Sequence, residues 1–169
     1  MLNRMGGVGI IVCGMTGSGK STFVKQLISG VDVDRLLVYD VNAEYFPNEP
    51  LPDISDFLKE CIAAEETIQI FEEATVFFSN RGSNADMRRL LVAKRHQRNI
   101  IILLFHSIRS IPHYIYDLCN YVVLFRTNDN EQIVSGKHEV LLPAYNYVKN
   151  KKFIYGVTPL ETCYRIVGL

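Results

Sequence analysis

Residues 14–22 read GMTGSGKST, and this stretch decides the fold class. It matches the pattern G-x-x-x-x-G-K-[ST], with Gly14, Gly19, Lys20 and Ser21 at the fixed positions. The apolar run VGIIVC at 8–13 comes directly before it and predicts a buried strand. A helix is expected to follow Gly19 and to run to about Ile28. A strand, a glycine-rich loop and a helix in this order predict a phosphate-binding P-loop.

The chemistry of this loop favours a nucleoside triphosphate. Glycines let backbone N–H groups turn toward phosphate oxygens, and the start of the helix favours negative charge. Lys20 can reach the β- and γ-phosphates, and the Ser21 hydroxyl can ligate Mg²⁺. ATP is favoured over GTP because the chain has no Asn-Lys-x-Asp segment for reading guanine. The expected nucleotide-binding residues are Gly14, Thr16, Gly17, Ser18, Gly19, Lys20, Ser21 and Thr22.

The rest of the chain alternates between apolar runs and amphipathic segments. Strands that are apolar throughout and separated by helices indicate a parallel sheet covered on both faces. Further strands are expected at 35–40, 67–71, 100–105 and 121–125, and helices at 54–66, 84–98 and 111–119. Short edge strands are possible at 152–157 and 163–167, and 126–132 is expected to be a mobile loop. The fold class is therefore α/β: one three-layer P-loop NTPase domain over 1–169, with a mostly parallel sheet.

Composition limits the partners and the compartment. The 169 residues carry no net charge, so nothing favours nucleic acid globally, but 76–112 hold 7 Lys/Arg and 1 acid. The sequence has no apolar run of the roughly 18 residues that a membrane span needs. The four cysteines form no CxxC pair, so we expect buried free thiols and a reducing, cytoplasmic setting.

Acidic residues follow two of the expected strands. After IQIF at 68–71, we assign Glu72 to hydrated Mg²⁺ and Glu73 to orienting and activating an attacking water. The alternative is a solvated acidic turn. Asp40 ends the second strand and Glu44 follows it, so Asp40 either lies near the site or caps a turn.

Two further groups of residues have a functional and a structural interpretation. His106 or Ser107, directly after the fourth strand, could contact the γ-phosphate and sense hydrolysis; alternatively, His106 is a hydrogen-bonded structural histidine. The basic segment could supply an arginine to a neighbouring subunit's nucleotide, because the guanidinium charge and planar fork suit that task. It could equally be a solvated basic face; its members are Arg88, Arg89, Lys94, Arg95 and Arg98.

Four segments together resemble the HerA/FtsK superfamily of ring-forming, DNA-pumping ATPases. They are TGSGKS at 16–21, YDVNAEY at 39–45, IFEEA at 70–74, and LLVAKRHQR at 90–98 with the strand that follows. The last segment is similar to the small viral genome-packaging ATPases of that superfamily. Two positions depart from the pattern: Glu72 stands where the family usually has Asp, and His106-Ser107 where its sensor is commonly Gln.

The resemblance implies a RecA-like core that assembles as a ring, a pentamer or hexamer, around double-stranded DNA. It makes Arg95 the first candidate for an arginine acting in a neighbouring subunit, and Arg98 the second. It also implies a viral portal or capsid vertex protein as a partner, and the cytoplasm of a host cell as the location.

Three functions are open at this point. The first is an ATP-driven DNA translocase, most consistent with viral genome packaging. The second is a small-molecule kinase of the nucleoside or nucleotide type, with 81–98 as its arginine-bearing lid. The adjacent Glu72 and Glu73 suit activation of water better than phosphoryl transfer to a bound acceptor, which favours the translocase. The third is a regulatory nucleotide switch or an assembly factor.

Overall fold

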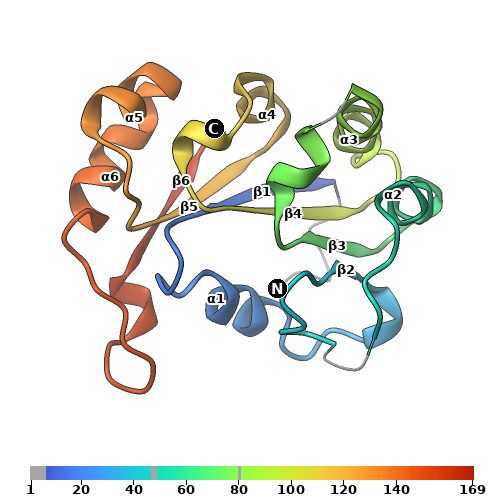
Figure 1. Cartoon of the computed structure of the whole chain (residues 1–169), viewed down its shortest axis with the longest axis horizontal. Helices are drawn as coiled ribbons and strands as arrows, with labels where there is room; N and C mark the ends of the chain where they lie inside the picture. Colours follow the sequence, from blue (N-terminus) through green and yellow to red (C-terminus); the bar gives the residue numbers. More distant parts are fainter. Residues whose placement is uncertain (1–6, 47–48, 80) are drawn as a thin grey trace.

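The computed structural model describes residues 7–46, 49–79 and 81–169. Its centre is a six-stranded sheet in the order β2-β3-β4-β1-β5-β6 (Figure 1). The first five strands are parallel to their neighbours, and β6 pairs antiparallel with β5. The strands are β1 (Val8–Cys13), β2 (Leu36–Tyr39), β3 (Ile68–Phe71), β4 (Ile100–Phe105), β5 (Tyr121–Phe125) and β6 (Tyr164–Gly168). The predicted mostly parallel α/β sheet is confirmed.

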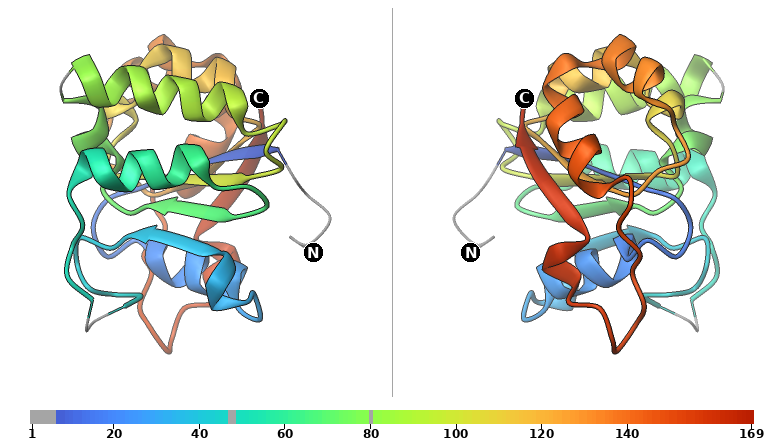
Figure 2. Two further views of the ribbon diagram at one scale, coloured as in Figure 1. Left: turned by 90° about the vertical axis from the view of Figure 1, so that its right-hand side faces the viewer. Right: turned by 90° about the vertical axis from the view of Figure 1, so that its left-hand side faces the viewer.

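Two apolar cores cover the two faces of the sheet and make three layers. The larger core joins alternate strand residues such as Ile11 and Leu103 to the helices α2 to α6. The smaller core joins the intervening residues, such as Val12 and Ile102, to α1 (Lys20–Ile28) and the C-terminal segment around Leu160. Figures 1 and 2 show α1 alone below the sheet and the other helices above it. These are α2 (Ile54–Ala63), α3 (Arg81–Ala93), α4 (His113–Leu118), α5 (Glu131–Lys137) and α6 (Leu142–Val148).

The register of the central strands places three chain segments at one edge of the sheet. Cys13 at the end of β1 lies opposite Phe105 at the end of β4, and Phe71 at the end of β3 lies opposite Leu103. The loops that leave these strands therefore begin side by side. This is the carboxyl edge, where ligands bind in open parallel sheets.

The structure differs from the sequence-based expectations mainly in the last third of the chain. Helices α5 and α6 were not predicted. The segment 126–132 was predicted to be mobile, but Asp129 within it is 7% exposed, and its carboxylate accepts the Ile108 N–H at 2.6 Å. The Asn130 side chain caps α5. The segment 152–157 forms no strand, whereas 163–167 corresponds to β6.

Candidate nucleotide site

The P-loop has a shape that only glycine permits at two positions. A Cβ on Gly14 would lie 2.6 Å from the Cβ of Phe125 and 2.7 Å from the Ser18 hydroxyl oxygen. Gly19 has φ +101, and a Cβ there would lie 2.8 Å from a methyl carbon of Leu160. Both glycines therefore let the loop pass close to β5 and the C-terminal segment.

Lys20 points back into its own loop. Only 7% of the residue is exposed, and its Nζ donates to the carbonyl oxygens of Gly14 at 2.7 Å and Met15 at 3.2 Å. Burial lowers its pKa, which the nearby Cys13, Glu73, Glu44 and Glu72 oppose. A desolvated ammonium at this position interacts strongly with any anion that enters the loop.

His106 joins Lys20 to Glu73. Its Nδ1 lies 3.4 Å from Lys20 Nζ, and its Nε2 lies 2.7 Å from Glu73 Oε2. An ammonium only donates hydrogen bonds, so Nδ1 accepts and Nε2 carries the hydrogen that it donates to Glu73. The other carboxylate oxygen of Glu73 accepts from the Thr75 hydroxyl. The result is a hydrogen-bonded chain of three side chains, from the start of α1 past the end of β4 to the end of β3.

Glu72 points to the other side of β3, toward the loop after β2. It is 5% exposed; Oε2 accepts the Asn42 N–H at 3.1 Å, and Oε1 is buried without a hydrogen-bond partner. Burial raises the pKa of Glu72, and the nearby Glu44 and Asp40 raise it further against the Asn42 hydrogen bond. Glu72 is therefore not part of a solvated acidic turn.

Asp40 is a cap for the turn after β2. Its carboxylate accepts the N–H groups of Glu44, Tyr45 and Phe46 at 2.8, 2.7 and 2.7 Å. Burial would raise the pKa of Asp40, but these three donors and a contact with Glu72 hold it below its usual value. The capping alternative is the one that the geometry supports.

The residues at this edge fit a P-loop magnesium site. In the described ranges, no three His, Cys, Asp or Glu side chains group together as a metal site. Mg²⁺ beside a nucleotide takes few protein ligands, since phosphate and water supply the others. Ser21, the second residue of α1, and the unpartnered Glu72 Oε1 are the two oxygens that could hold it, directly or through water.

Two openings flank the P-loop, and Phe153 lines both. The first, of about 180 Å³, is lined by the loop from Gly17 to Thr22, by Glu44 and by Phe153. The second, of about 160 Å³, is lined by Met15 to Ser18, by Phe153 and by three basic side chains, Arg126, Lys151 and Lys152. Phe153 was not predicted as a site residue. The stretch KKF at 151–153, two basic residues and one aromatic residue at the start of the expected strand, was the signal for it in the sequence.

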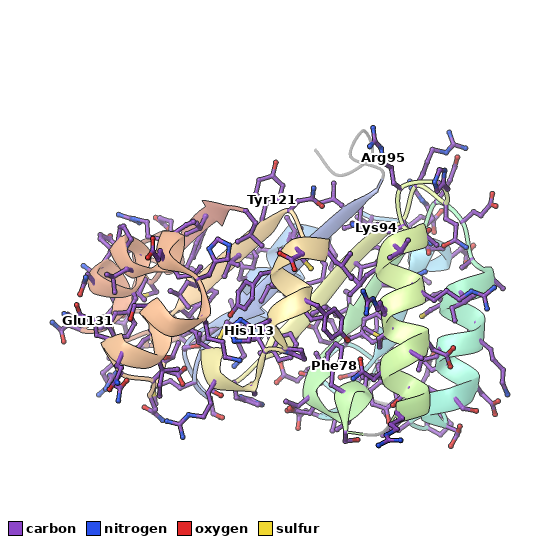
Figure 3. The ribbon with its side chains drawn as sticks, turned by 90° about the horizontal axis from the view of Figure 1, so that it is seen from above. Phe78, Lys94, Arg95, His113, Tyr121 and Glu131 are labelled. Carbon is purple, nitrogen blue, oxygen red and sulfur yellow. The ribbon has the colours of Figure 1, made fainter. Side chains whose placement is uncertain are left out.

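The arginine candidates lie at the amino ends of the strands, opposite the carboxyl edge that holds the P-loop. The exposed Arg95 follows α3 (Figure 3). A Cβ on Gly7, which precedes β1, would lie 2.8 Å from the Arg95 Cα. Arg98 is exposed and forms an ion pair with Glu66. Lys94 donates to the carbonyl oxygens of Leu91 and Leu118, so its role is structural. Arg95 and Arg98 therefore do not belong to the phosphate site of their own chain.

No protein-family model matches this sequence, and no curated protein matches it. Solved structures do. The genome-packaging NTPase B204 from Sulfolobus turreted icosahedral virus 2, in complex with AMPPCP, is 19% identical with a TM-score of 0.69, over 95% of this chain and 97% of that one. B204 of Sulfolobus turreted icosahedral virus, a DNA-packaging ATPase, is 17% identical with a TM-score of 0.64, over 97% and 98%.

A third similar structure is the N-terminal domain of zonular occludens toxin from Neisseria meningitidis. It is 16% identical with a TM-score of 0.51, over 72% of this chain and 78% of that one. In the described part of the chain, no helix has both the length and the apolar character to cross a membrane. Across nearly its whole length, this chain has the P-loop NTPase fold of the viral genome-packaging ATPase B204.

Proposed function

We propose that this protein is an ATPase that moves double-stranded DNA, working as a ring of subunits in viral genome packaging. The observation that carries the ATPase proposal is the hydrogen-bonded chain from Lys20 through His106 to Glu73. It connects a phosphate-binding residue to a carboxylate that can activate water. A kinase would need a bound acceptor at that place instead.

In this proposal each residue has one task. Lys20 and the P-loop N–H groups hold the phosphates, while Ser21 and Glu72 would hold Mg²⁺, which neutralises phosphate charge when bound. Glu73 orients a water molecule and takes its proton. His106 holds the Glu73 carboxylate in place from one side, and Thr75 holds it from the other. Filling the P-loop with phosphate gives Lys20 a new partner, so His106 senses the nucleotide through Lys20.

The likeness to DNA-packaging ATPases supports double-stranded DNA as the cargo and a pentameric or hexameric ring as the assembly. Arg95 would then complete the site of the next subunit, with Arg98 as the second candidate. Arg95 is exposed and lies beside Gly7, before β1, so its guanidinium is accessible to a neighbouring subunit. A viral portal or capsid vertex protein would be the docking partner, in the cytoplasm of the host.

The test is ATP hydrolysis measured with and without double-stranded DNA at low salt. We expect stimulation by DNA, and we expect Glu73→Gln to abolish hydrolysis while leaving ATP binding intact. Glu131→Gln, an exposed position at the start of α5, is the matched control. Unstimulated hydrolysis together with fast phosphoryl transfer to a nucleoside monophosphate would refute the translocase and support the kinase.

A further inference from the structure

An apolar tip projects from the loop between α6 and β6. Ile154, Tyr155 and Val157 are 46%, 82% and 75% exposed there. The tip has a defined turn: the N–H groups of Val157 and Thr158 donate to the Ile154 carbonyl at 3.0 and 2.9 Å. We call residues 151–158 the tip loop; it extends below the body of the molecule in Figure 1 and in both views of Figure 2.

A groove with apolar walls lies beside β2. It has a volume of about 450 Å³ and includes Val33 and Leu51, which are 60% and 49% exposed. Leu36 and Phe57 also line it, and slightly more than half of its surface is apolar. Its charged members are all acids: Asp40, Glu49 and Glu60. We call this feature the β2 groove.

The tip loop and the β2 groove lie at opposite edges of the sheet. The order of strands places β2 at one edge and β6, which follows the tip loop, at the other. Figure 1 shows α1 between the tip loop and β2, so the tip projects away from the groove of its own chain. Two different complementary surfaces on one molecule generate a head-to-tail contact, which closes into a ring when the rotation between subunits permits.

We propose that the tip loop of one subunit inserts into the β2 groove of the next copy of this chain. Three apolar side chains would leave water and meet apolar walls. The basic residues beside the tip, Lys151 and Lys152, would face the acids Glu49 and Glu60. This inference deepens the proposed function, because it names the surfaces that build the ring.

The character of the tip favours a protein partner over DNA. Phosphates attract the lysines but offer nothing to Ile154, Tyr155 and Val157, which are the most prominent side chains of the loop. Exposed apolar side chains that gather at one place commonly mark sites of protein contact. The acid-lined groove would repel DNA and attract the lysines, so a single pairing accounts for both surfaces.

The contact would also link two nucleotide sites. At the base of the tip loop, the Phe153 ring packs against Gly19, so that a Cβ there would lie 3.2 Å from it. At the groove, Asp40 holds the turn after β2 and neighbours Glu72. The inserted loop would therefore run from the P-loop of one subunit to the acidic pair of the next.

The test introduces one charge into each surface of the full chain. Tyr155→Asp places a charge in the apolar tip, and Leu51→Asp places one in the apolar wall of the groove. Val92→Asp, at an exposed apolar residue of α3, is the matched control. Oligomers are measured by analytical ultracentrifugation with double-stranded DNA and a non-hydrolysable ATP analogue, and folding by circular dichroism. A second tip variant, Val157→Asp, covers the case in which Tyr155→Asp does not fold.

We expect each variant to weaken self-association by about tenfold or more, since a charge at the centre of an apolar contact costs the most. Mixing the two variants should produce one-to-one dimers and nothing larger. The intact tip of the Leu51→Asp variant can enter the intact groove of the Tyr155→Asp variant. The surfaces left over in that pair both carry the introduced charge, so no third subunit can bind. The control should assemble like the wild type.

Four results overturn the proposal. Wild-type assembly of either variant, or a mixture that stays monomeric, refutes the interface while DNA-stimulated hydrolysis can still stand. Loss of DNA binding by Tyr155→Asp with assembly intact assigns the tip to DNA instead. A wild-type chain that stays monomeric with DNA and the analogue refutes the interface and the proposed ring together.

Discussion

Replacing His106 with alanine tests the link between phosphate binding and water activation. The variant removes the contact with Lys20 Nζ and the 2.7 Å hydrogen bond to Glu73, but leaves Lys20 its two carbonyl partners. ATP binding should therefore change little. The Glu73 carboxylate keeps Thr75 as a partner and becomes free to turn about it.

The size of the effect follows from the hydrogen bond to Glu73. A hydrogen bond to a charged group contributes about 1.5–3 kcal/mol. The His106 side chain is 46% exposed, so solvent screening favours the lower end of that range. If the bond acts fully in the transition state, about 1.5–2 kcal/mol corresponds to a fall in kcat of about tenfold to thirtyfold.

The assay is steady-state ATP hydrolysis, with nucleotide affinity measured separately by fluorescence titration. His106→Gln is the control, because its amide can accept from Lys20 and donate to Glu73. It should recover most of the lost kcat. Equal losses in the alanine and glutamine variants, or an unchanged kcat in His106→Ala, would refute the reasoning, and so would a loss confined to ATP binding.

Three other changes have defined outcomes. Burial raises the pKa of Glu72 in the folded protein, so the ionised carboxylate destabilises the fold at pH values above the usual pKa of a glutamate. In a thermal scan, Glu72→Gln should therefore raise the melting temperature at about pH 8 and leave it unchanged at about pH 4. Asp129→Ala removes a buried acceptor and should lower the free energy of unfolding by about 1–3 kcal/mol for each buried donor that it leaves unsatisfied, measured by urea titration, with Asp129→Asn milder. Inactive Arg95→Ala and Lys20→Ala subunits should partly restore hydrolysis when mixed; verified mixed rings without activity would place the role of Arg95 within its own chain.

The parts of the fold that local sequence determines were predictable. The P-loop has glycines that its close contacts require, and the five parallel strands are short, almost wholly apolar runs. The ends of the strands then fix which side chains meet, so Glu73 and His106 could be placed at one edge before their contact was known.

The last third of the chain was not predictable in the same way. Helix α5 reads EQIVSGK, with one buried residue, Val134, so it has little apolar periodicity. It follows a turn that is held from a distance, by Asp129 to the loop after β4 and by the Tyr145 hydroxyl to the Asp129 carbonyl. The run FIYGV at 153–157 has strand-like residues, but Tyr155 faces solvent and Phe153 packs on the P-loop.

Because Asp129 and Phe153 contact the loops of the nucleotide site, the site is completed by segments that are synthesised after the P-loop. The P-loop at 14–22 is translated before His106. The turn that follows His106 is held by Asp129, and one wall of the phosphate opening is Phe153, both made later still. Domains fold as they are completed, so a growing chain carries the nucleotide-binding motif long before it has a finished site. The opening beside the P-loop therefore gains its Phe153 wall only after the C-terminal segment has been made and has folded.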